Sequence, residues 1–573
     1  MDILSLAFIL FLVGVCAVYY VVPRPARAAW LLCCSYLFYL YDAANAAYVA
    51  VLIAATVLTY GAGLALEALR KVWLRRVVLG VCVAACMGGF FVFKYYKVFA
   101  DAANGLLGRA ALPALSLVMP LGISYFSFMA LGYVIDVYRR KAPAERDFFY
   151  YALFVSFFPC IFTGPIERAG NMLPQFKAPP RFDYERFAGG VFRILWGFFK
   201  KLVLAGILGQ LVDNIYLGIA RDTYPGPLLL AMCLGFCYQL YIDFSAATDI
   251  AVGAGALLGI RVMENFRRPF AAKSFTELWR RWHISLTSWF RDYLYISLGG
   301  NRRGKARQYF NQLAVFFASG LWHGATLPYV VWGLANGAAL CIGKATAPFR
   351  RRLEPYNPLY HFAPLRAFFK TAVTYLVFAA CFVFFVVGVH SGTLADAGYL
   401  FSHFFTGWGG FFGDWDAAVE LMSGLKVTFA AFLAMVFSIL LVEGFECAEI
   451  PVNQLIRKVP FPVRLALYYV LVLFILFFGA FGKSGFVLSL IHIFRAPCRR
   501  KAVSSPAWAI LFPRCASAPP PSGRRPWIKA ASSWPASAGT AWSRPWPRPW
   551  PWSKTATTAS PCPPTPRMCP PKW

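Results

Sequence analysis

Runs of about twenty apolar residues recur along most of this chain, and they constrain its fold more than any other feature. A transmembrane helix needs about 20 such residues, because the hydrocarbon core of a bilayer is about 30 Å thick. Hydrophobic residues make up 59% of the 573 residues and charged residues only 14%, whereas charged residues are about 25% of a soluble domain. The sequence therefore predicts an all-α, polytopic transmembrane protein and excludes a soluble enzyme.

We expect about ten to twelve spans, with re-entrant and interfacial helices in addition. The predicted apolar segments are Ile3–Val22, two within Ala28–Leu66 that break near Asp42, Val77–Phe93, Leu112–Ile135, Gly189–Leu211, Leu228–Ile242, Ala251–Ile260 as a half-helix, two within Phe310–Ile342 that break near Pro328, Thr371–Val389, Val427–Val442 and Val463–Phe481. The first run follows Asp2 rather than a basic segment, so we interpret it as a span and not as a removable signal.

The formal net charge of +31 is carried largely by short clusters of Lys and Arg between the apolar runs. Such clusters mark cytoplasmic helix ends, so membrane lipid and not nucleic acid is the expected partner. The stretch Ser391–Leu425 has no Lys or Arg and is expected outside, whereas the basic stretch Arg261–Arg307 is expected inside. The count of crossings agrees if Tyr150–Arg168, which contains Pro159 and Pro165, is a re-entrant segment.

Residues 487–573 differ in kind from the rest. The last 84 residues hold 18 of the 39 prolines, 8 of the 18 tryptophans and 13 Lys and Arg, but no Asp or Glu. Such a composition has no hydrophobic period and cannot bury a core. We divide the chain into a transmembrane domain, 1–486, and a disordered Pro/Arg/Trp-rich tail, 487–573, which we interpret as out-of-frame or artefactual sequence. The alternative is a basic tail that touches anionic lipid.

The 15 cysteines do not suggest a metal site. Pairs such as Cys82/Cys86 and Cys233/Cys237 lie inside apolar runs, without the histidines or the paired spacing of a zinc site. We therefore expect packing roles for them and no bound metal.

His323 is the first candidate for chemistry, because a polar group inside hydrocarbon costs several kcal/mol unless it is paired or useful. It lies in the apolar run Phe316–Trp332, roughly 15–20 Å along a helix from the basic cluster ending at Arg307. That depth is near the middle of a bilayer, where a neutral imidazole is a useful base. Gly320 and Gly324 flank it and would let a substrate approach the backbone. A purely structural histidine is the alternative.

His283 is the second candidate and lies within Phe275–Arg307. Aromatic side chains recur there at helical spacing on one side, and Arg280, Arg281 and Arg291 gather toward the other. The pattern predicts an interfacial amphipathic helix. Such a helix could simply lie on the membrane, or its arginines could bind a phosphate-bearing cytoplasmic donor at the mouth of a cavity.

Two further clusters interrupt apolar runs. Asp243 and Asp249 lie within Tyr238–Ile260, and Glu167 and Arg168 follow a Gly-Pro turn. Internal ion pairs or helix caps explain both clusters, while a place in a substrate passage is the functional alternative.

These four stretches together resemble the membrane-bound O-acyltransferase family, most closely its bacterial branch that includes alginate O-acetyltransferases. The resemblance runs from about Met1 to Gly485, so residues 1–486 are expected to form such a domain. Its strongest parts are GPIER, YIDFSAATDIAVG, ENFRRPFAAKSFTELWRRWHISLTSWFRDYLYISLGGNRRG and GLWHG. Each motif alone is weak, but all four in this order are highly specific.

The resemblance implies a multi-helix fold around a membrane-crossing tunnel, with His323 as the catalytic histidine and His283 as a second functional one. It also implies acetyl transfer from cytoplasmic acetyl-CoA, without a bound cofactor, across the bacterial inner membrane to a sugar hydroxyl outside. A separate extracytoplasmic transferase usually completes delivery to alginate, peptidoglycan or a similar polymer. A neighbouring branch passes D-alanine toward teichoic acids, which remains the alternative.

The chemistry of acyl transfer agrees with these candidates, because it needs a base, donors for an oxyanion and exclusion of water. We assign His323 as the base and expect His283 to orient the donor thioester, with Trp322 and the three arginines, Arg280, Arg281 and Arg291, in donor binding. Asp243 and Asp249 are expected in the tunnel wall. Broken helices and buried acids also fit a transporter or channel, but the chain shows no internal repeat. The sequence leaves the acceptor polymer open.

Overall fold

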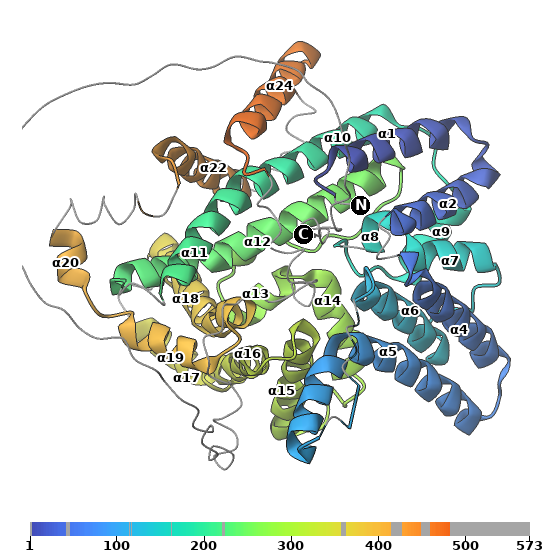
Figure 1. The fold of residues 1–573 in the computed structure, drawn as a ribbon, viewed down its shortest axis with the longest axis horizontal. Helices are drawn as coiled ribbons and strands as arrows, with labels where there is room; N and C mark the ends of the chain where they lie inside the picture. The colour runs from blue at the N-terminus through green and yellow to red at the C-terminus, as the bar shows by residue number, and fades with distance from the viewer. Residues whose placement is uncertain are drawn as a thin grey trace, which may run out of the picture. The chain divides into compact units, whose positions relative to one another are not determined.

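The described part of the chain is built entirely from helices and the loops between them in this computed structural model (Figure 1). The structure describes residues 3–481 apart from 42–45, 110, 114, 116, 118, 162, 220–223, 357–361, 414–423, 425–426 and 448–458. These described residues belong to one compact unit. The prediction of an all-α fold with several apolar helices is confirmed, while the predicted tail, 487–573, lies outside the described residues.

The helices follow one another with short connections. In the first half they are α1 Leu6–Val21, α2 Arg27–Leu40, α4 Val49–Ala68, α5 Val72–Leu107, α6 Ile123–Tyr138, α7 Phe148–Ser156, α8 Phe158–Ile161, α9 Ala169–Lys177, α10 Tyr184–Phe199, α11 Gly206–Gly218 and α12 Gly226–Leu257. In the second half they are α13 Phe275–Arg281, α14 Ile284–Trp289, α15 Gly304–His323, α16 Leu327–Ala345, α17 Ala347–Leu353, α18 Ala363–His390, α19 Leu394–His403, α20 Trp408–Gly413, α22 Phe429–Cys447 and α24 Phe461–Phe478. Two π-helical segments, Lys200–Ala205 and Phe290–Tyr295, join α10 to α11 and follow α14.

Five of the described helices are long and apolar enough to cross a membrane, namely α4, α5, α12, α18 and α24. A sixth candidate is the pair formed by α16 and the segment Ala347–Tyr356, which bends by 49°. Four shorter apolar helices, Leu6–Val21, Ile123–Tyr138, Phe148–Ile161 and Ala430–Phe445, complete the set. The chain is therefore a multi-pass membrane protein.

α12 lies alongside α10 and α11 and is a single helix of 32 residues (Figure 1). The predicted division of this region into a span, Leu228–Ile242, and a separate half-helix, Ala251–Ile260, is therefore wrong. Close packing explains the continuity. A Cβ on Gly190 would meet the backbone of Gly253, and a Cβ on Gly253 would meet that of Gly190, so these two small residues let α10 and α12 approach.

The predicted amphipathic helix Phe275–Arg307 is also wrong as one element, because it breaks at His283. The backbone of His283 is left-handed, with φ 43°, and separates α13 from α14. Asn265 holds the break, since its carbonyl oxygen accepts from Ile284 N at 2.8 Å and its side-chain oxygen accepts from Ser285 N at 3.1 Å. The aromatic side chains of this segment are buried in the protein, so it does not lie on the membrane as an interfacial helix.

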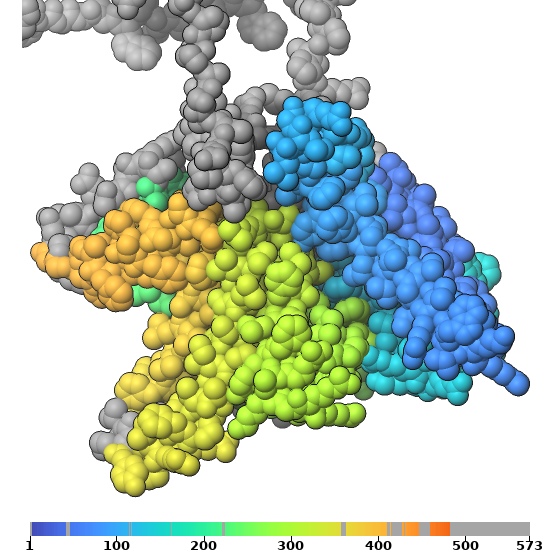
Figure 2. All heavy atoms as spheres, turned by 90° about the horizontal axis from the view of Figure 1, so that it is seen from below, coloured from blue at the N-terminus to red at the C-terminus, as the bar shows by residue number. Residues whose placement is uncertain are grey.

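α15 and α16 form a hairpin with His323 at its tip. The break falls at residues 324–326, and Pro328 lies in the first turn of α16. A Cβ on Gly320 would meet the carbonyl oxygen of Tyr329, and one on Gly324 would meet the Tyr329 ring. These glycines therefore serve the close packing of the hairpin and not, as expected, the approach of a substrate. α5 lies beside this hairpin (Figures 1 and 2).

Candidate active site

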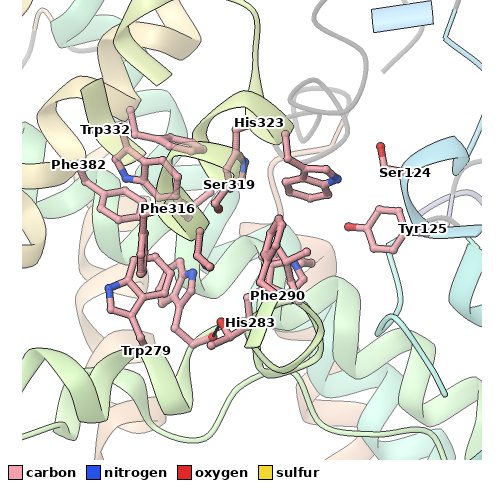
Figure 3. A pocket seen from close by; sticks show the side chains of 18 of the residues that line it. Ser124, Tyr125, Trp279, His283, Phe290, Phe316, Ser319, His323, Trp332 and Phe382 are labelled. Carbon is pink, nitrogen blue, oxygen red and sulfur yellow. Dashed lines mark hydrogen bonds between the residues drawn. The ribbon is translucent and has the colours of Figure 1, made fainter. Parts of the chain in front are cut away.

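His283 and His323 line one cavity, although forty residues separate them in the sequence (Figure 3). The cavity has a volume of about 130 Å³, and most of its lining is aromatic or aliphatic. It brings together residues of α5, α6, α12, α13, α14, α15, α16 and α18. The structure thus joins the two histidines that the sequence singled out.

His323 is the last residue of α15 and is partly exposed to the cavity. Its ring packs edge-on against Trp332, with centroids 4.9 Å apart, and against Phe385, at 5.0 Å. No described residue forms a hydrogen bond with its ring nitrogens. The imidazole is therefore held in place by packing and keeps its nitrogens available for a substrate.

His283 is 4% exposed, and its Nδ1 lies 3.4 Å from the side-chain oxygen of Asn265. Its Nε2 is buried, and no described residue is its partner. The ring lies 4.7 Å from Phe244 and 6.2 Å from Trp322, measured between centroids. Trp322 in turn stacks edge-on against His323 at 4.7 Å. One indole ring therefore bridges the two histidines, as its assignment to the site requires.

Lys94 of α5 lines the same cavity and is a site residue that the sequence reasoning missed. It is 8% exposed, and its Nζ donates to the carbonyl oxygen of Trp322. Its ammonium also lies 5.1 Å from the Phe90 ring and 5.7 Å from the Trp322 ring. No carboxylate of the described residues pairs with it. A signal was present, since a lysine inside an apolar run is as costly as a histidine.

Three indole N–H groups around the cavity are buried and have no acceptor among the described residues. They belong to Trp279, Trp322 and Trp332. A buried donor without a partner costs about 1–3 kcal/mol, so these groups are expected to find an acceptor in a bound substrate. Trp322 was expected in the site, whereas Trp279 and Trp332 were noted only for their hydrophobicity.

The three arginines expected to bind the donor lie elsewhere. Arg280 and Arg291 are exposed, and Arg281 is partly buried. Arg281 pairs with Glu277 at 2.5 Å, and Arg291 pairs with Asp292 at 2.8 Å. None of the three lines the histidine cavity.

The two aspartates expected in the tunnel wall form buried ion pairs instead. Asp243 pairs with Lys201, whose side chain is 0% exposed. Asp249 pairs with Arg193 at 2.9 Å and with Lys200 at 2.5 Å. Neither aspartate lines the histidine cavity. These pairs join α12 to α10 and the following π-helix, which is the structural alternative for this cluster.

Glu167 and Arg168 also have structural partners. Glu167 is 1% exposed and accepts from Met263 N at 2.5 Å and from the side chain of Asn171 at 2.9 Å. Burial raises the pKa of the Glu167 carboxyl, and these hydrogen bonds act against that shift. Arg168 lies 4.5 Å above the Tyr293 ring. Among the described residues no group of three His, Cys, Asp or Glu side chains could hold a metal ion.

Comparison with known proteins agrees with this geometry. Residues 116–386 match the model of the membrane-bound O-acyltransferase family. A probable alginate O-acetylase of Pseudomonas syringae pv. tomato is 36% identical over 419 residues, which cover 71% of this chain and 75% of the relative. A peptidoglycan O-acetyltransferase of Helicobacter pylori is 33% identical, over 57% of this chain and 66% of the relative.

A teichoic acid D-alanyltransferase of Bacillus subtilis is also similar, with 28% identity over 49% of this chain and 70% of the relative. The matched family region contains both histidines of the cavity and the α15–α16 hairpin. An enzyme that transfers acyl groups, and not a transporter or channel, is the class that these similarities identify. The chain belongs to the membrane-bound O-acyltransferase family and is an O-acyltransferase.

Proposed function

We propose that this enzyme transfers acetyl groups from cytoplasmic acetyl-CoA to hydroxyl groups of an extracytoplasmic polysaccharide such as alginate or peptidoglycan. It would do so in the bacterial inner membrane, with a separate extracytoplasmic acetyltransferase as its partner. One observation carries the proposal. Two histidines with available ring nitrogens share an aromatic cavity with three indole donors that lack an acceptor among the described residues.

In the proposed reaction His323 is the general base. The acceptor hydroxyl oxygen attacks the carbonyl carbon of the thioester while a ring nitrogen of His323 takes the hydroxyl proton. The electron pair of the C=O bond moves to the oxygen, which becomes an oxyanion. When the C=O bond forms again, the C–S bond breaks, and the leaving thiolate takes the proton from the imidazolium. One acetyl ester and one thiol are produced.

The cavity lining suits this oxyanion. The indole N–H groups of Trp279, Trp322 and Trp332 are donors, as is the His283 ring when its proton is on Nε2. The ammonium of Lys94 adds a positive charge in the same cavity. Donors and charges in a dry site stabilise a developing anion strongly, because they need no reorganisation. We therefore assign His283 and Lys94 to stabilising the donor carbonyl.

The size of the cavity supports a small acyl group. A volume of about 130 Å³ is close to that of an engineered apolar cavity of about 150 Å³ that binds benzene. It has room for an acetyl group and the thioester atoms but not for a nucleotide. Its aromatic walls exclude water, which would otherwise take the acyl group.

The lining also favours acetyl over D-alanyl transfer. A D-alanyl group carries an ammonium, which would need an acidic partner in a buried site. The described residues that line the cavity include Lys94 but no Asp or Glu, so a second ammonium would be repelled. D-alanyl transfer, as named for the Bacillus subtilis relative, is therefore the weaker candidate.

The proposed direction of transfer is supported by the charges at the two ends of α12. Gly226, at its first turn, donates to Thr406 at 2.7 Å, so this end lies beside the acidic stretch Ser391–Leu425. The basic residues Arg261 and Arg267 follow the other end. A helix of 32 residues is about 48 Å long. The positive-inside rule then assigns the arginine end to the cytoplasm.

Inverted membrane vesicles from the natural host test the proposal. They contain the full chain and its partners, enclose the acceptor polymer and expose the cytoplasmic face to added radiolabelled acetyl-CoA. We expect label in alginate or peptidoglycan, and we expect His323→Ala to reduce its rate about 10²–10⁴-fold. His403→Ala, which changes a histidine remote from the cavity, is the matched control. Unchanged transfer by a normally expressed His323→Ala variant would reject His323 as the base.

A further inference from the structure

A second and much larger cavity is lined by five arginines. Its volume is about 1060 Å³, and we call it the arginine pocket. The charged residues of its lining are Arg168, Arg186, Arg193, Arg261, Arg267, Glu167 and Glu264. It lies between α9, α10, the end of α12 and the segment that follows α12.

The two carboxylates of the arginine pocket are already engaged. Glu264 forms a bidentate pair with Arg193, with one contact at 2.6 Å. Glu167 accepts from the backbone of Met263 and the side chain of Asn171. Four guanidinium groups therefore remain without neutralisation by the acids of the pocket itself.

Those four guanidinium groups have free hydrogen-bonding capacity within the described structure. Nη1 of Arg168 and Nε of Arg186 are buried and have no partner among the described residues. The side chains of Arg261 and Arg267 are exposed, and none of the described residues pairs with them. Several arginines around one cavity suit an anion with several oxygens, and phosphate is the best match for the planar guanidinium.

The arginine pocket adjoins the histidine cavity. Ile284 lines the arginine pocket, and His283, the preceding residue, lines the histidine cavity. Glu264 lines the arginine pocket, and the next residue, Asn265, holds the His283 break through its hydrogen bonds to Ile284 and Ser285. The wall between a large cationic space and a small aromatic one is therefore only a few residues thick.

We infer that the arginine pocket binds the phosphate groups of the acyl donor. This inference rests on the proposed function and names the class of donor, a thioester of a phosphorylated pantetheine. The phosphate-bearing end occupies the arginine pocket, and the narrow thioester arm passes the His283 wall to reach His323. Arg261 and Arg267 take the place in donor binding that the sequence suggested for Arg280, Arg281 and Arg291.

Three donors that differ only in phosphate content test the inference. Acetyl-CoA, acetyl-4′-phosphopantetheine and acetyl-pantetheine are compared in the inverted vesicles with the unchanged enzyme. We expect KM to rise about tenfold or more from acetyl-CoA to acetyl-pantetheine, with phosphopantetheine between them, because each phosphate adds charge-assisted hydrogen bonds. Equal KM values for all three would overturn the inference without any variant. Absence of transfer from every thioester would instead reject the proposed function.

A pair of double variants then locates the phosphate contacts. Arg261→Gln/Arg267→Gln is expected to raise KM for acetyl-CoA about tenfold or more and to leave kcat and the KM for acetyl-pantetheine within about twofold. Arg351→Gln/Arg352→Gln removes the same charge from exposed arginines of α17 and is the matched control. Equal effects of the two double variants on acetyl-CoA, or an equal loss on acetyl-pantetheine, would contradict a phosphate site at Arg261 and Arg267.

Discussion

The ammonium group of Lys94 donates a hydrogen bond to the backbone carbonyl of Trp322, the residue that precedes His323. These residues are 228 positions apart in the sequence, and the contact joins α5 to the tip of the α15–α16 hairpin. It fixes a cation beside the reactive histidine in a cavity whose described lining contains no carboxylate. A buried charge of this kind is expensive unless it meets an opposite charge during the reaction.

We therefore predict that Lys94→Met reduces kcat for acetyl transfer about 10²–10³-fold and changes KM for acetyl-CoA little. The methionine keeps the length and the apolar stem of the side chain but removes the charge that stabilises the oxyanion. An interaction made mainly in the transition state lowers kcat and kcat/KM together. Initial rates over a range of acetyl-CoA concentrations in inverted vesicles measure both constants.

Lys97→Met is the matched control for this prediction. Lys97 is an exposed lysine three residues farther along α5, so its replacement changes the same helix and the same charge without touching the cavity. We expect it to leave both constants within about twofold. If Lys94→Met behaves like Lys97→Met, the ammonium has no part in stabilising the transition state.

The two histidines could be predicted from the sequence because each is an ionisable group in an apolar context, which needs no knowledge of the fold. The rest of the site could not. Trp279 and Trp332 gain their meaning from the hairpin and the break at His283, which aim their N–H groups at the same space. Lys94 reaches the site from a helix that nothing in the local sequence links to His323.

The misplaced elements have a common physical cause. A helical projection of Phe275–Arg307 puts Arg280 and Arg291 on one face only if the helix is continuous, and the left-handed backbone of His283 breaks that continuity. Gly253 lowers helix propensity in α12, yet tertiary packing against Gly190 keeps the helix intact. Hydrophobic periodicity reports which residues are apolar, whereas the breaks and close approaches depend on partners distant in the sequence.

The buried pair of Asp243 and Lys201 leads to a prediction about stability. Asp243→Ala leaves the Lys201 ammonium, which is 0% exposed, without its counter-charge, and breaking a buried pair in this way costs about 3–5 kcal/mol. We expect a clear fall in the midpoint of thermal unfolding in detergent. Replacing both residues, as Asp243→Leu/Lys201→Met, removes the uncompensated charge and is expected to recover much of that loss.

The outcome separates a structural pair from a functional one. Full acetyl transfer by the folded double variant is expected, because neither residue lines the histidine cavity. A double variant that unfolds at the temperature of the unchanged protein but transfers no acetyl groups would show that the pair takes part in the reaction, contrary to its structural assignment here.

The hairpin that carries His323 leads to the last prediction, because its two helices approach most closely at Gly320. A Cβ at Gly320 would meet the carbonyl oxygen of Tyr329 in α16, and a backbone atom cannot move aside as a flexible side chain can. Gly320→Ala is therefore expected to shift the hairpin tip and lower kcat at least about tenfold, since small errors in the position of a catalytic group reduce the rate strongly. Gly343→Ala, in α16, has no atom within 4 Å of the added Cβ and is the matched control, expected to leave kcat unchanged within about twofold. Assays of both variants at equal amounts of membrane protein make the comparison, and equal rates would show that the hairpin tolerates the added methyl group without moving His323.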